Sequence, residues 1–147
     1  MTYLELKQKH REEFESFPII FAFSNSQLEE GLKQLNCTKE DLRATGASGF
    51  IRKEDTQALR DLINRHAEET AEAFKDDSFL TSAIKYELAN HEYCITHDPE
   101  PTMHALGLDL EDITGQVRRC FNVAKTEYLS EYYEWERQQA EKERLQS

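Results

Sequence analysis

Apolar residues recur every three or four positions along most of the chain, which is the spacing of one face of an α-helix. The clear stripes predict helices over residues 2–15, 55–74 and 78–94, and a long last helix from about Asp109. Shorter patterns predict a helix capped by either Ser24 or Ser26, one after the cap residue Thr38, and one over residues 99–106. Only five Gly and three Pro interrupt these patterns. We therefore expect a mainly α fold, a bundle of about five to six helices.

Two short apolar segments lack the helical spacing. They cover about residues 18–23 and 49–52, where aromatic and β-branched side chains are concentrated. We expect them to pair as a minor two-stranded β element. The sequence shows no internal repeat and no linker, so residues 1–136 are predicted to form a single domain. Residues 137–147 are almost entirely polar, and we expect them to form a solvated, fraying tail.

Composition and charge narrow the classes of function. The chain has 147 residues and a formal net charge of −11, and this acidity disfavours direct binding to DNA or RNA. No apolar run approaches the roughly 20 residues that a membrane-spanning helix needs. The first 15 residues are charged throughout, unlike a signal peptide, and the three cysteines are an odd number. We expect a cytoplasmic protein with reduced thiols.

The stretch "NHEYCITHDPEP", residues 90–101, groups side chains that bind metals. His91, Cys94 and His97 form an H-x-x-C-x-x-H pattern, but its spacing matches none of the usual zinc signatures. The alternative is structural: His91 continues a buried stripe, while Asp98 and Pro99 begin the next helix as its cap and first residue. A Cys–His nucleophile pair lacks the activating surroundings that such chemistry needs. We predict no catalytic residue and no cofactor, and metal or small-ligand binding at this junction is the second hypothesis.

A second candidate is the stretch "GASGFIRKED". Its residues Gly46, Gly49, Arg52 and Lys53 precede a helix and could hold an anion on backbone amides and basic side chains. The pattern is not that of a known phosphate-binding loop. The alternative is a turn in which both glycines adopt positive φ, and we prefer it.

Acidic residues gather on the outer faces of two predicted helices. They are Glu68, Glu69, Glu72, Asp76, Asp77, Glu127, Glu131 and Glu134. One interpretation is an ordinary solvated surface. The other is a surface that resembles the phosphates of a nucleic acid and binds a basic, nucleic-acid-binding protein. Aromatic residues late in the last helix are also compatible with a homodimer or a partner groove.

Three segments, "FPIIFAFSNSQLEEG", "TGASGFIRKED" and "ELANHEYCITHD", resemble a family of short uncharacterised proteins from bacteria and their phages. The resemblance covers residues 14–125. It implies no activity and no catalytic residue, but it does imply a cytosolic setting associated with mobile elements, where small acidic proteins often inhibit defence nucleases. Our first hypothesis is therefore a non-enzymatic protein that presents acidic helix faces to a basic protein partner and spans no membrane.

Overall fold

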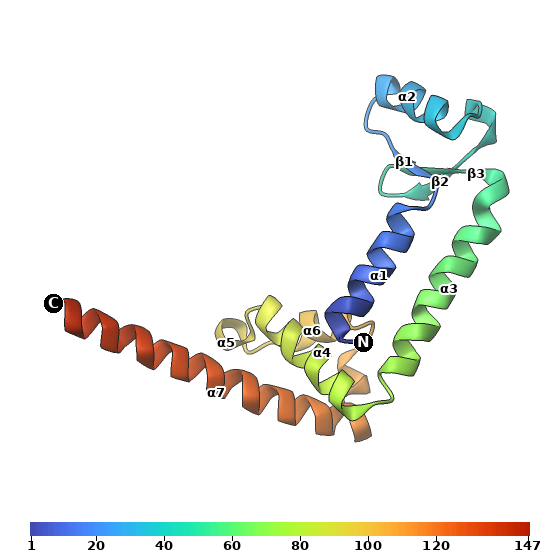
Figure 1. The fold of residues 1–147 in the computed structure, drawn as a ribbon. Helices are drawn as coiled ribbons and strands as arrows, with labels where there is room; N and C mark the ends of the chain where they lie inside the picture. Colours follow the sequence, from blue (N-terminus) through green and yellow to red (C-terminus); the bar gives the residue numbers. More distant parts are fainter. The chain divides into compact units, whose positions relative to one another are not determined.

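Seven α-helices and one small antiparallel sheet make up the fold, which confirms the predicted mainly α class. The structure is a computed structural model that describes residues 1–147, and its elements are labelled in Figure 1. The chain divides into two units, residues 1–71 and 72–147, each with its own set of internal contacts. No helix combines the length and the apolar character that crossing a membrane requires. That the two units make one domain stays a prediction.

The first unit contains three helices and all three strands. In chain order these are α1 (Tyr3–Glu15), β1 (Ile19–Phe21), α2 (Asn25–Leu35), β2 (Leu42–Gly46), β3 (Gly49–Arg52) and α3 (Thr56–Ala73), whose last two residues belong to the second unit. The predicted pairing of β1 with β3 is confirmed, with Ile19 opposite Ile51. The prediction of only two strands is wrong, because β2 pairs along the other edge of β3.

The strand β2, which was not predicted, follows a helical turn whose capping residues are recognisable in the sequence. Thr38 and Asp41 form the capping box of a single 3₁₀ turn, where we had predicted a short helix. The chain then runs directly into β2, whose sequence "LRATG" has one large apolar residue and an exposed side chain at four of its five positions. A strand of this kind carries almost no period-2 signal, so only its pairing with β3 reveals it.

Glycine decides the geometry at two places in this unit. Gly31 lets α2 lie directly on β1, since a Cβ there would collide with Ile20 Cδ1. In the β2–β3 hairpin, Gly46 has the predicted positive φ of 93°. Gly49 does not, and there a Cβ would lie 2.5 Å from Thr45 Oγ1. The prediction for Gly49 was therefore wrong in its reason: crowding, and not a left-handed φ, demands glycine.

The second unit is built on two long helices. Its elements are α4 (Asp77–Asn90), α5 (Tyr93–Thr96), α6 (Glu100–Ala105) and α7 (Gly115–Gln146). The stripes of α4 and α7 pack against each other and bury Ile84 and Leu88 from α4 and Ala124 from α7 to complete exclusion of solvent. This burial of apolar surface is the main stabilising term for the unit.

Three helix boundaries differ from the prediction. The helix predicted over 78–94 ends at Asn90, because Glu92 adopts a left-handed φ of 52° before α5 begins. The last helix starts at Gly115 and not at Asp109, since Asp109 caps a separate 3₁₀ turn. At the start of α6, Asp98 Oδ1 accepts the Glu100 N–H at 3.0 Å, but the cap position is Pro99, one residue later than predicted.

Candidate functional site

Most of the predicted acidic surface is paired within the protein. Lys85 of α4 lies 2.5 Å from Glu131 and 3.6 Å from Glu127, and these carboxylates raise the pKa of Lys85. Glu134 binds Arg137 at 2.7 Å, and Glu72 binds Lys75 at the same distance. These ion pairs sit at exposed positions, where each contributes roughly 0–1 kcal/mol. Their effect on an acidic surface is to reduce the charge available to a partner.

The remaining predicted carboxylates have separate structural tasks. Asp76 caps α4 by accepting the Phe79 N–H at 2.8 Å. Asp77 Oδ1 accepts a hydrogen bond from Gln116 Nε2 at 2.8 Å. Glu69 belongs to a cluster between α1 and α3, whereas its neighbour Glu68 is exposed on the outer side of α3. Most of these carboxylates therefore take part in separate local contacts.

That cluster centres on two stacked histidine rings. The rings of His10 on α1 and His66 on α3 are 4.0 Å apart at their centroids, and their planes are 17° from parallel. His10 Nε2 lies 3.0 Å from Glu69 Oε2 and is hydrogen-bonded to it. His66 Nε2 faces Glu13 Oε2 at 3.6 Å, too far for a hydrogen bond. Both rings are more than four-fifths buried.

Two cations complete the cluster. Lys9 Nζ lies 2.9 Å from Glu69 and 3.7 Å from Glu13. Arg65 binds Glu13 on the opposite helix and Glu69 on its own helix, the latter at 3.2 Å. Hydrogen bonds from Lys9 and then His10 lower the pKa of Glu69 to about 2, and the bond from Arg65 lowers the pKa of Glu13. Both carboxylates are therefore ionised at neutral pH.

The cluster comes from a short repeat in the sequence. Residues 6–13 and 62–69 both read L-x-x-[KR]-H-x-E-E. Their helices α1 and α3 run antiparallel (Figure 1), so the two motifs are related by a local twofold axis. The two histidines stack on each other, and the cation of each motif binds the last glutamate of the other. The prediction of no internal repeat was wrong, because a motif of eight residues that occurs twice is hidden among many charged residues. Comparing the two helices with each other would have found it.

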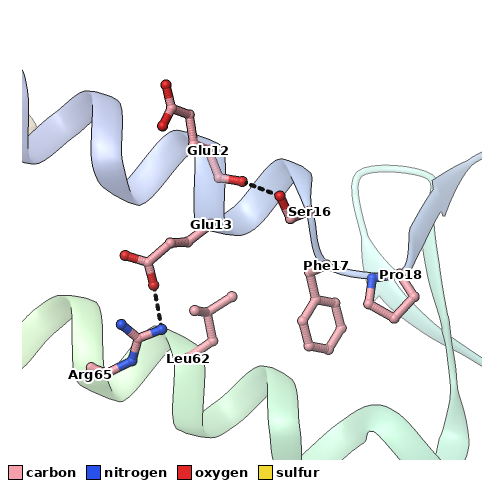
Figure 2. Close-up of a pocket in the computed structure, with 7 residues that line it drawn as sticks. All are labelled: Glu12, Glu13, Ser16, Phe17, Pro18, Leu62 and Arg65. Carbon is pink, nitrogen blue, oxygen red and sulfur yellow. Dashed lines mark hydrogen bonds and ion pairs between the residues drawn. The ribbon is translucent and has the colours of Figure 1, made fainter.

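A shallow pocket opens beside this cluster, at the end of α1. It has a volume of about 410 Å³, and Figure 2 shows the residues that line it. They are Glu12, Glu13, Ser16, Phe17, Pro18, Leu62 and Arg65. Phe17 and Leu62 face the space between the helices, and the Glu13–Arg65 ion pair closes one side. The pocket combines an apolar floor with a charge-balanced wall.

The junction predicted as a metal site has other contacts. His91 Nε2 is 3.2 Å from the buried Glu87 carboxylate, and the His97 ring packs edge-on against Tyr93. The Cys94 N–H donates to Tyr128 Oη at 3.1 Å. No group of three or more His, Cys, Asp or Glu side chains is arranged to hold a metal ion. The three predicted ligands therefore take part in three separate interactions and do not converge.

The predicted anion site is also dispersed. Gly49 and Arg52 stand at opposite ends of β3, and Gly46 lies in the hairpin. Arg52 Nε binds Asp55 Oδ2 at 2.8 Å, which raises the pKa of the guanidinium. Arg52 and Lys53 both line a pocket of about 420 Å³, in which the carboxylates of Asp41 and Glu54 are also present. The charge of Arg52 is thus compensated inside the protein, and the four residues do not surround one point.

An uncovered aromatic cluster lies on α7. The last buried residue of this 32-residue helix is Tyr128, although the helix continues to Gln146. Beyond Tyr128, the Tyr132 ring contacts those of Tyr133 at 5.7 Å and Trp135 at 6.1 Å. Tyr133 and Trp135 are 57% and 55% exposed. The aromatic stripe that packs on α4 therefore continues past the end of α4 and faces solvent.

The comparisons with known proteins give one result. The family of unknown function DUF7659 matches residues 2–127. The chain belongs to this family. The comparisons with curated proteins and with solved structures each found no match. The region matched to DUF7659 contains both histidine motifs and the junction at Cys94, whereas the aromatic cluster of α7 lies beyond it.

Proposed function

We propose that this protein acts by binding another protein, without catalysis, through the C-terminal half of α7. The supporting observation is the exposed cluster of Tyr132, Tyr133 and Trp135 on a helix whose first half is packed. Tyr and Trp are enriched among the residues that dominate binding energy at protein interfaces. Their rings provide a large apolar area and lose little conformational freedom on binding. The cluster is a small anchor surface of this type.

Charge indicates the chemistry of the partner. Residues 72–147 carry 16 acidic and 8 basic side chains, a formal net charge of −8, whereas residues 1–71 carry 13 and 10. On α7, Glu136 lies beside Trp135 of the aromatic cluster, whereas Glu131 and Glu134 are already paired with Lys85 and Arg137. Such a surface attracts a basic partner at long range, and arginine side chains also stack on aromatic rings. We propose a basic, nucleic-acid-binding protein as the partner.

In its finer form, the proposal is that α7 occupies the surface with which the partner binds nucleic acid and so inhibits it. The resemblance to proteins of bacteria and their phages favours a nuclease as the target. Two of the predicted carboxylates, Glu69 and Asp76, are unsuitable for charge-reversal variants because they have structural roles. Reversing the charge of Glu69 would disrupt the histidine cluster, and reversing Asp76 would remove a helix cap. Substitutions on α7 avoid both problems.

The test uses the double variant Tyr133→Ser and Trp135→Ser. Val123→Ser is the matched control, since Val123 is 49% exposed on the packed half of the same helix. Immobilised wild type and control should capture the same basic protein from an extract of the source cells. The double variant should capture at least about tenfold less, the effect of losing about 1.4 kcal/mol of binding energy. Equal capture by all three proteins would refute the proposal that this part of α7 is the binding surface.

Elution separates the general proposal from its finer form. Raising the salt concentration should release the captured protein, because its attraction to the acidic unit is screened. Duplex DNA or RNA should release it as well, if nucleic acid and α7 compete for one basic surface. If salt releases the captured protein but nucleic acid does not, inhibition by competition is refuted. The proposal that α7 is the binding surface would then still stand.

A further inference from the structure

The two halves of the histidine cluster differ by one hydrogen bond. On one side, His10 Nε2 is bonded to Glu69. On the related side, His66 Nε2 is a buried atom without a hydrogen-bond partner and lies 3.6 Å from Glu13 Oε2, which Arg65 binds. A buried polar atom that lacks a partner is destabilising, and in native proteins it calls for an explanation. We explain the unpartnered nitrogen of His66 by the number of protons that the rings of His10 and His66 can carry together.

A neutral imidazole has one N–H and one acceptor nitrogen. Because a carboxylate only accepts, the His10 Nε2 must carry the hydrogen that faces Glu69. His66 Nε2 could approach Glu13 in the same way if it carried a proton. A second positive ring would then lie 4.0 Å from the first. Stacked cations at this distance repel each other strongly in a partly buried site.

The charged groups around the rings cannot compensate two additional positive charges. The groups that face the rings are Lys9 and Glu13 from α1, and Arg65 and Glu69 from α3. Their charges sum to zero while both rings are neutral. One protonated ring gives the cluster a net charge of +1 and two give it +2, with the added charge on rings that are more than four-fifths buried. When both rings are protonated, their repulsion would therefore drive α1 and α3 apart.

We propose that this cluster is a proton-operated latch that holds α1 against α3 while at most one ring is charged and releases α1 when both are protonated in mild acid. Burial, and then the charge of His10, lower the pKa of His66, so the ring is neutral at pH 7. Because the pKa is lowered on folding, its contribution to stability is complete above about pH 6.5. That contribution is lost as the pH falls from 6.5 towards the folded value. Release of α1 would uncover Leu62 at the floor of the adjoining pocket.

Hydrogen exchange of the full chain tests the latch. Between pH 7.5 and 5.5, after correction for the intrinsic pH dependence, protection of the α1 amides should fall by about tenfold for each unit by which the His66 pKa is lowered. The carboxylates titrate below this window and do not contribute. The variant His66→Phe keeps a stacked ring without a proton, and its α1 protection should not depend on pH. His104→Phe, at a site 56% exposed, should behave as wild type.

Two further measurements keep the latch testable if His66→Phe fails to fold. His66→Gln is neutral at every pH and should also flatten the profile. An NMR titration of wild type should show a protonation midpoint of His66 below 6.5. A His66 midpoint at or above 6.5, or α1 protection with the same pH dependence in wild type and a folded His66 variant, would overturn the proposal.

Discussion

Replacing Gly31 with alanine tests how closely α2 lies on the sheet. A Cβ at this position would overlap Ile20 Cδ1 and lie 3.2 Å from Ile20 Cβ. Ile20 is 6% exposed and is held in β1, so it has little room to move. Overpacking of this kind costs about 1–3 kcal/mol, while alanine gains about 1 kcal/mol over glycine in helix propensity. We expect Gly31→Ala to lower the stability of the first unit by about 0–2 kcal/mol.

A double-mutant cycle isolates the contact. Ile20→Val removes the colliding Cδ1 and should cost about 0.5–1.5 kcal/mol by itself. With both substitutions the alanine should fit, so the double variant should be about 1–2 kcal/mol more stable than the sum of the single effects. Native-state hydrogen exchange of the α2 amides measures this within the first unit. A Gly31→Ala variant that is stabilised by about 1 kcal/mol, with additive effects in the cycle, would refute the close approach.

Three other measurements address individual contacts. Asp76→Ala removes the cap of α4 and should cost about 1 kcal/mol, seen as faster exchange of the Phe79 amide, whereas Asp76→Asn should retain most of it. Tyr128→Phe removes the hydrogen bond to the Cys94 N–H and should cost about 1 kcal/mol in urea unfolding of the second unit. The pKa of Glu69 is lowered to about 2 on folding, so its contribution to stability is present above about pH 4.5. It should be lost as the pH falls from 4.5 towards 2, and a Glu69→Gln variant with the same acid unfolding profile as wild type would contradict this assignment.

The local features of the chain were readable from sequence. The Ser24 side chain, one of two predicted candidates, caps α2 by accepting the Gln27 N–H at 3.2 Å, and Asp98 accepts the Glu100 N–H at the start of α6. The stripe of α4 is buried where the apolar spacing placed it. The caps depend on residues within about four positions of each other, so the sequence alone determines them. The β1–β3 pairing was also predictable, because both segments are rich in apolar residues that the sheet buries.

Tertiary structure decided the rest, because it brings together residues that are far apart in sequence. His10 and His66 are separated by 56 positions, and only the antiparallel packing of α1 on α3 turns two unremarkable helical motifs into one charged cluster. The same holds for Glu69, which sequence placed on a solvated face and packing placed against Lys9. On α7 the apolar spacing is continuous through Tyr132, but α4, the helix that covers this face, is shorter and ends at Asn90. Periodicity shows which face of a helix is apolar, but the length and position of its partner determine how much of that face is buried.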